Sequence, residues 1–324
     1  MIAARSVSLI RADDAEPVVG VEDLSRVGDM LYLSAYDRRE ERAGGVYVVP
    51  VADVMNPRLS RVLVTRIPVT APESPPARPH GLHAMAGATV QLAVISRPAP
   101  GAPHEPPEIL ILRGADRLSV SQRLKDRRLC NANEIISLRE DRLLITNDRA
   151  DCGRWGRVYA NVFRPRGGTL LRLDGDVLTV VADRIGFANG VEADERHVYV
   201  AATRARALHI FDRATIEAAH EPVLPLRTLA LPGGPDNMVW GDDGKLYIAV
   251  HPNLLQFAFF RLNRGVGAPS RVVSYDPGSD EIVTVADLPA GSALQGATAA
   301  LRVRNALILA GAFADGLAVI RMEA

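Results

Sequence analysis

Short apolar runs bounded by turn-forming residues follow one another along nearly the whole chain, and this pattern constrains the fold more than any other feature. Each run has the length of a β-strand rather than that of a helix. Clear examples are Met30–Ser34, Gly45–Pro50, His197–Ala201, Leu246–Val250 and Ala306–Ala310. Helical spacing of apolar residues is evident only in a short segment around Thr215–Ala219. The sequence therefore predicts an all-β fold.

The turns between these runs indicate how the strands are connected. Asp174-Gly175 separates two strand-like runs and suits a tight hairpin, because Gly accepts a positive φ. Repeated strand–turn–strand units over 324 residues favour a β-propeller over a single sandwich. Six four-stranded blades around a central channel would take about 54 residues each and seven would take about 46. We expect one domain over residues 1–324, with residues 149–168 as a candidate active-site lid.

Charge and cysteine content exclude several classes of function. The chain carries 38 Lys and Arg against 38 Asp and Glu, so no basic excess would attract nucleic acid or an anionic membrane. No apolar stretch is long enough for a signal peptide or a membrane span, which favours a soluble, cytoplasmic protein. Cys130 and Cys152 are the only cysteines, too few for a thiolate zinc site. One bridge between them is geometrically possible, but we expect two free thiols. The expected partner is a small molecule, and the sequence does not define an oligomeric state.

Polar residues stand at the start of several predicted strands, in apolar surroundings. This set contains Glu22-Asp23, His80, Asn133-Glu134, Asn189 and Asp236-Asn237. The successive intervals from Glu22 through His80, Asn133 and Asn189 to Asp236 are 58, 53, 56 and 47 residues. Their mean is close to the length of one blade in a six-bladed arrangement. Because residues one repeat apart occupy equivalent positions on successive innermost strands, these side chains would meet at one mouth of the central channel.

Carboxylates and amides in this set offer hard oxygen ligands, which Ca²⁺ takes in shells of about six to eight. Glu22 and Asp236 would balance the charge of the ion, and Asn133, Asn189 and Asn237 would complete its shell. A cation would also relieve repulsion between carboxylates inside a channel. Taken singly, such residues are ordinarily explained as turn chemistry, as for Asn189 followed by Gly. Spacing alone therefore leaves a calcium site and unrelated turns both open.

Longer motifs, in a fixed order, resemble a known family. The segments GFANGVEADERHVYVAATRARALHIFD, GGPDNMVWGDDGKLYIAVHPN and LQGATAAL are similar to those of the paraoxonase/arylesterase family of calcium-dependent propellers, within the gluconolactonase-like superfamily. The resemblance runs from about Val19 to the C-terminus, is strongest from Phe187 onward and is gapped between His104 and Arg166. It implies a six-bladed β-propeller with four-stranded blades and calcium in its channel.

The resemblance also implies two calcium ions and a role for individual residues. The ligands of a catalytic ion would be Glu22, Asn133, Asn189, Asp236 and Asn237. A buried structural ion would be held by Asp23, by Glu134, where the family has Asp, and by the backbone carbonyl of Leu82. His80 matches the general base proposed for the family, and His251 matches a second active-site histidine. Asp236 is the alternative base or nucleophile.

Arg97 marks the main departure from the family. The base of the family is paired with a second histidine on the following strand, and here Arg97 occupies that place. A His–His proton relay is therefore not expected. The terminal disulfide and the hydrophobic leader of the animal members also have no counterpart in this sequence. We expect a soluble, bacterial-type member of the family.

Together these features predict a calcium-dependent hydrolase of lactones, with aryl esters as secondary substrates. The ion would polarise the ester carbonyl, and His80 or Asp236 would activate water. Trp155, Tyr159, Phe163 and the run Leu254–Phe260 are candidates to line the pocket, and the run is equally well interpreted as a blade edge. Two alternatives stay open. One is a gluconolactonase-like or strictosidine-synthase-like propeller with another substrate. The other is a non-catalytic binding propeller stabilised by calcium, which the loss of the histidine pair favours.

Overall fold

The computed structural model describes residues 4–70, 76–87, 89–102, 105–114, 117–149, 167–263 and 265–322. Strands predominate throughout these ranges, which confirms the all-β prediction. The chain divides into two compact units: unit 1 comprises residues 1–68, 75–79 and 236–324, and unit 2 comprises residues 69–74 and 80–235. The candidate lid at 149–168, with Trp155, Tyr159 and Phe163, falls almost entirely outside the described residues.

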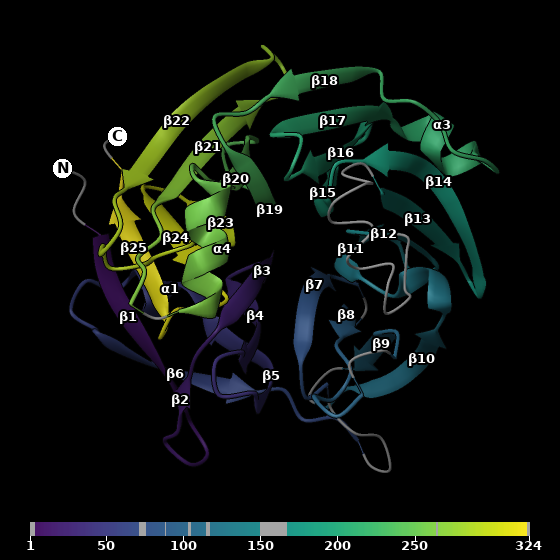
Figure 1. Cartoon of the computed structure of the whole chain (residues 1–324). Coiled ribbons are helices and arrows are strands. Elements are labelled where there is room, and N and C mark those ends of the chain that lie inside the picture. The colour runs from purple at the N-terminus through teal and green to yellow at the C-terminus, as the bar shows by residue number, and fades with distance from the viewer. Residues whose placement is uncertain are drawn as a thin grey trace. The chain divides into compact units, whose positions relative to one another are not determined.

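A nine-stranded sheet makes up most of unit 1. Its strands are β1 (Ala4–Arg11), β2 (Pro17–Val18), β3 (Val21–Val27), β4 (Met30–Asp37), β5 (Arg42–Pro50), β6 (Arg61–Arg66), β23 (Ala299–Val303), β24 (Ala306–Ala310) and β25 (Leu317–Arg321). The order is β23-β24-β25-β1-β6-β5-β4-β3, and β2 pairs with β1. β1 is antiparallel to β25 and parallel to β6, as Figure 1 shows in purple beside yellow. The N-terminal strand therefore completes a group of four with the last three strands and joins it to β3–β6.

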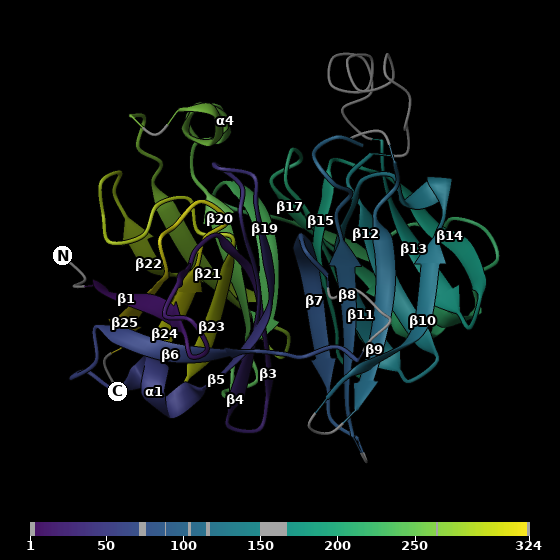
Figure 2. The same ribbon diagram turned by 90° about the horizontal axis from the view of Figure 1, so that it is seen from below.

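The second sheet of unit 1 contains four strands and leads to the main helix. Its strands, in order, are β19 (Gly234–Trp240), β20 (Leu246–His251), β21 (Ser270–Asp276) and β22 (Glu281–Leu288). α1 (Val51–Met55) follows β5, and α4 (Leu254–Leu262) follows β20. Figure 2 shows these helices at opposite ends of the unit 1 strands. α4 begins where the Asn253 side chain accepts a hydrogen bond from Gln256 N–H at 3.0 Å. The blade-edge interpretation of Leu254–Phe260 is therefore wrong.

Unit 2 is built from three four-stranded antiparallel sheets. They are β7 (Pro79–Met85), β8 (Val90–Ser96), β9 (Glu108–Gly114) and β10 (Ser119–Lys125); β11 (Ala132–Arg139), β12 (Arg142–Asn147), β13 (Gly168–Asp174) and β14 (Val177–Ile185); and β15 (Ala188–Ala193), β16 (His197–Ala202), β17 (Ala207–Asp212) and β18 (Arg227–Ala230). A 3₁₀ turn spans Arg127–Leu129, and α3 (Arg213–Ala218) matches the one helix that the sequence predicts. The Asp-Gly hairpin is confirmed, because Asp174 pairs with Val177 and Gly175 has a φ of 55°.

Burial follows the position of each strand in its sheet. The middle strands, such as β8 and β24, are buried on both faces and are correspondingly almost entirely apolar. The last strand of each unit 2 sheet is half-exposed, and β10 alternates residue by residue. Apolar clusters fill the space between neighbouring sheets, for example around Ile136, Val191 and Val200 in unit 2. The first strands are the exception, because they carry the buried polar residues that the sequence predicts as site residues.

Several four-stranded antiparallel sheets in an all-β chain are consistent with a β-propeller. Among the described residues, no helix has both the length and the apolar character needed to cross a bilayer. Cys130 is disulfide-bonded, so the prediction of two free thiols is wrong. Its sulfur also lies 3.8 Å from the carbonyl of Arg149, at the edge of the segment predicted as a lid.

Candidate active site

In unit 1, the polar residues gather around the start of β3. Glu22 and Asp23 are buried although both carry carboxylates. The backbone carbonyl of Glu22 accepts a hydrogen bond from Thr298 Oγ1 at 2.7 Å and a longer one from Asn237 Nδ2 at 3.4 Å. Asp23 accepts a hydrogen bond from Leu24 N–H at 2.8 Å. These bonds connect the first strands of two sheets, and they bring the side chain of Asn237 to the backbone of Glu22.

The side chain of Glu22 is held by an arginine that the sequence analysis did not select. Arg38 Nη2 lies 3.0 Å from Glu22 Oε2, and both side chains are largely buried. β3 and β4 form an antiparallel hairpin, in which Val27 pairs with Met30 next to the turn at Gly28. The end of β4 therefore lies beside the start of β3, and Arg38, which directly follows β4, lies close to Glu22. The turn at Gly28 is the sequence signal from which this proximity could have been predicted.

Asp236 and His251 form a buried pair at the adjoining ends of β19 and β20. His251 Nε2 lies 2.7 Å from Asp236 Oδ2, and only 1% and 7% of the two side chains are exposed. Phe257, on α4, stacks on the imidazole with 3.5 Å between ring centroids and 15° between planes. An ionised Asp236 accepts the Nε2 proton, so a neutral His251 keeps its lone pair on Nδ1. That atom is buried and has no hydrogen-bond partner among the described residues.

In unit 2, the predicted site residues lie on the first strands of the three sheets. His80 and Leu82 are on β7, Asn133 and Glu134 on β11, and Asn189 on β15, and all five are buried. Glu134 Oε1 accepts a hydrogen bond from Ile135 N–H at 2.8 Å. β7 and β11 approach so closely at Gly81 that a Cβ there would lie 2.7 Å from this carboxylate oxygen. Residues 80–82 and 133–134 are therefore brought together.

Thr146, on β12, joins the second and third of these strands. Its hydroxyl donates to the carbonyl of Asn189 and accepts a hydrogen bond from Glu134 N–H at 3.0 Å. The side-chain amide nitrogen of Asn189 donates to Thr203 Oγ1 at 3.2 Å. The amide oxygen of Asn189 therefore points away from Thr203. Thr146 is completely buried, so this network holds the backbone of both predicted ligands in place. The sequence gives no local signal for Thr146, because an interior threonine on a strand is unremarkable.

His83 lies one residue beyond Leu82 and is kept neutral by its surroundings. Burial lowers the pKa of His83 to about 4. Its Nδ1 accepts a hydrogen bond from Ser137 N–H at 3.1 Å, which requires the unprotonated nitrogen. His83 therefore acts as a fixed link between β7 and β11.

The residues fit a hard cation. The side-chain oxygens of Asn133, Asn189 and Asn237 are buried and have no hydrogen-bond partner in the described part of the chain. A buried amide oxygen without a partner costs about 1–3 kcal/mol, and a hard cation is one kind of partner that would offset this cost. No cluster of three or more His, Cys, Asp or Glu with metal-binding geometry is found among the described residues.

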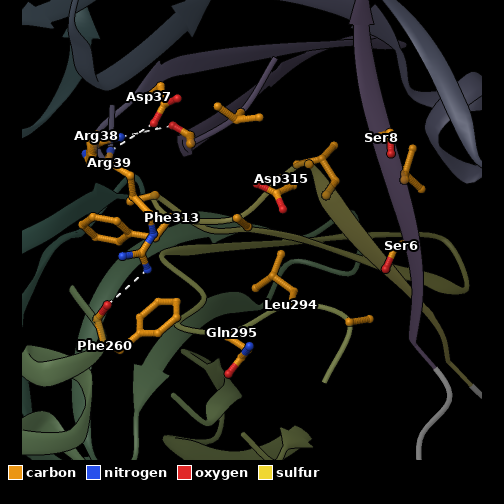
Figure 3. A pocket seen from close by; sticks show the side chains of 18 of the residues that line it. Ser6, Ser8, Asp37, Arg38, Arg39, Phe260, Leu294, Gln295, Phe313 and Asp315 are labelled. Atoms are coloured by element: carbon orange, nitrogen blue, oxygen red, sulfur yellow. Dashed lines mark hydrogen bonds between the residues drawn. The ribbon is translucent and has the colours of Figure 1, made fainter. Parts of the chain in front are cut away.

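A cavity of about 870 Å³ lies within unit 1, and none of the predicted ligands or histidines lines it. Arg38 lines the cavity and also forms an ion pair with Glu22. Figure 3 shows Arg39 between the rings of Phe260 and Phe313, with its guanidinium carbon 4.9 and 5.0 Å from their centroids. Arg39 also donates to the carbonyl of Phe260 at 3.1 Å. The other walls are mostly polar and include Ser6, Ser8, Asp37 and Gln295.

Comparisons with known proteins identify the family of the chain. The sequence model of the arylesterase family matches residues 47–318. The fold is similar to that of a calcium-binding protein, regucalcin, from Agrobacterium tumefaciens (TM-score 0.53, 13% identity, covering 98% of this chain and 97% of the other). It is also similar to that of a gluconolactonase from Xanthomonas campestris (TM-score 0.51, 13% identity, 99% and 86%). No curated protein matches the chain. Because the family match spans most of the sequence, this chain belongs to the arylesterase (paraoxonase-like) family.

Proposed function

We propose that the chain is a calcium-dependent hydrolase of lactones that also accepts aryl esters. The observation that carries the proposal is the buried His251–Asp236 pair in a chain of the arylesterase family. A histidine that is oriented by a carboxylate and has its second nitrogen unpartnered has the arrangement of a general base. The related folds of regucalcin, titled a calcium-binding protein, and of a gluconolactonase support a lactonase-type propeller.

The proposed calcium ligands are the residues predicted from the sequence. For a catalytic ion they are Glu22, Asn133, Asn189, Asp236 and Asn237, and for a structural ion they are Asp23, Glu134 and the carbonyl of Leu82. When bound, the catalytic ion would stabilise the negative charge that develops on the carbonyl oxygen of the ester. The support for this assignment is the burial of all eight residues and the three partnerless amide oxygens.

The side chains of unit 1 provide the proton chemistry. Asp236 fixes the imidazole of His251 through the 2.7 Å hydrogen bond and stabilises it once it is protonated. His251 Nδ1 can then take a proton from water and later return it to the leaving oxygen. Phe257 stacks on one face of the ring and helps to fix its orientation. His80 is the second candidate base, as the family resemblance implies, and it is buried in unit 2.

We also propose a propeller of six blades. Four separate sheets have four strands each, and the nine-stranded sheet consists of two groups of four, joined by the parallel pairing of β1 and β6, with β2 added to β1. In this arrangement β1 completes the last blade by pairing with β25. A crystal structure would test the blade count directly.

A sugar lactone is the second candidate substrate. The similarity of the fold to that of a gluconolactonase supports it. Comparing turnover of a sugar δ-lactone with that of an aliphatic δ-lactone separates the two. A preference of at least about tenfold for the sugar lactone, equivalent to about 1.4 kcal/mol, would select the second candidate.

Matched histidine variants test the proposed roles. His251→Gln keeps a polar side chain of similar size but removes the base, and we expect turnover of a lactone to fall at least about tenfold. His80→Gln tests the alternative base in the same assay. His220→Gln, at an exposed position, is the control and should retain wild-type activity. Full activity in both H251Q and H80Q would exclude a histidine base.

A further inference from the structure

We infer that Arg38 weakens the binding of calcium, because it holds the carboxylate of Glu22 in an ion pair with which the ion must compete. The inference rests on the proposed function, in which Glu22 is a calcium ligand. Arg38 Nη2 lies 3.0 Å from Glu22 Oε2, and 10% and 7% of the two side chains are exposed. Charges this far from solvent are screened little by water or salt. The guanidinium is therefore a permanent positive charge beside the proposed ligand.

Arg38 is fixed in place by three different contacts. Besides the ion pair, Nη1 donates to the carbonyl of Gly20 at 3.1 Å. The guanidinium carbon also lies 4.0 Å from the centroid of the Tyr36 ring, a cation–π contact. A planar guanidinium held by a carboxylate, a carbonyl and an aromatic face loses all three contacts if it swings away. We therefore expect it to stay near Glu22 when a cation arrives.

The backbone around Arg38 is shaped for this contact. Gly20 has a φ of +69°, and a Cβ at this position would lie 2.2 Å from the carbonyl oxygen of Tyr36. Only glycine allows the segment before β3 to approach the end of β4 so closely. This approach brings the Gly20 carbonyl and the Glu22 carboxylate within reach of one guanidinium. The ion pair is thus a consequence of the hairpin geometry and not an incidental surface contact.

Two effects of Arg38 act in the same direction. Its charge repels a calcium ion bound at Glu22, which destabilises the loaded state. It also neutralises Glu22 when no ion is bound, so the calcium-free protein does not carry an unpaired buried carboxylate. Both effects reduce the free energy gained on binding calcium. The affinity of a calcium site depends on the charge around the ion. We therefore expect Arg38 to raise the Kd of this site for calcium and to make the bound ion exchange more readily.

The test measures calcium binding by isothermal titration calorimetry, together with melting temperatures with and without calcium, on the full chain. In Arg38→Met the charge is removed and the length is kept, and we expect the Kd for calcium to fall at least about tenfold. The calcium-free melting temperature should fall at the same time. Arg38→Gln, which keeps a donor without a charge, should show the same gain. Arg38→Lys keeps the charge and should stay near the wild-type Kd.

Arg26→Met is the matched control, because Arg26 is on the same strand as Glu22 and donates to the nearby carbonyl of Gly28. It should leave the Kd unchanged. If Arg38 were only a structural support, R38M and R38Q would lower the melting temperature and weaken calcium binding together. If the wild-type chain binds calcium, that result or an unchanged Kd in both variants would overturn the inference about Arg38 alone. If the wild-type chain does not bind calcium, both the inference and the proposed calcium role would be overturned.

Discussion

Replacing Gly81 with alanine tests whether the close approach of β7 and β11 positions the proposed ligands of unit 2. An added Cβ would lie 2.6 Å from the Asn133 carbonyl oxygen, 2.7 Å from Glu134 Oε1 and 2.8 Å from Glu134 Cα. Two of these three atoms belong to the backbone of β11 and cannot rotate away. Since optimal contacts of carbon lie at about 3.5–4.0 Å, the strands must separate by nearly 1 Å at this point.

We expect Gly81→Ala to reduce the free energy of unfolding by about 1–3 kcal/mol, the usual cost of overpacking. For a chain of this size that corresponds to a melting temperature about 1.5–4.5 °C lower. Glu134 is displaced in the same step, so the stabilisation by added calcium should also shrink. Differential scanning calorimetry with and without calcium measures both quantities.

Gly101→Ala is the control for this experiment. No atom lies within 4 Å of a Cβ at Gly101, and its φ lies outside the positive range. Alanine there should leave stability unchanged or raise it slightly, through the lower entropy of the unfolded chain. A Gly81→Ala protein that melts at the wild-type temperature and gains the same stability from calcium would refute the assigned geometry.

Three further substitutions test other parts of the site and its support. Thr146→Val leaves two buried backbone groups without partners and should cost about 2–4 kcal/mol in urea unfolding, whereas Thr146→Ser should cost less. Phe257→Ala exposes one face of His251 and should lower kcat about tenfold with little change in the Kd for calcium; an unchanged kcat would contradict a positioning role. Burial raises the pKa of Asp174, but its hydrogen bonds and ion pairs with two arginines outweigh this and lower the pKa. The stability that this carboxylate contributes is therefore present at neutral pH and is lost as the pH falls below about 4. Asp174→Asn should be less stable than the wild type at pH 7 and should lose less stability on acidification. Circular dichroism during unfolding at several pH values measures both differences.

Much of the fold could be predicted from the sequence because strand periodicity and turn chemistry are local. The hairpin at Asp174-Gly175 depends on the φ of one residue, and it forms as expected. The helix α4 was missed because its apolar run has no clear helical period. Its start depends on one capping bond from Asn253. Cys130 shows the same limit, since a disulfide depends on geometry that spacing does not reveal.

The candidate site was predicted only in part, for a similar reason. Spacing by one repeat identified the polar residues on the first strands, and all of them are buried as the prediction requires. Their partners were not identified, because Arg38 and Phe257 reach the site through hairpin register and helix placement. A sequence pattern marks which residues share a position in a repeat. It does not show which side chain from the next element neutralises or covers them.

The hydrolysis of an aliphatic lactone and of phenyl acetate, measured before and after chelation and again after the return of calcium, tests the central claim most directly. The proposed function predicts turnover of both substrates that disappears with EDTA and returns with Ca²⁺ but not with Mg²⁺. Phenyl acetate should be the slower substrate. Turnover that persists fully in EDTA, or no turnover although calcium binds and raises the melting temperature, would contradict a calcium-dependent hydrolase.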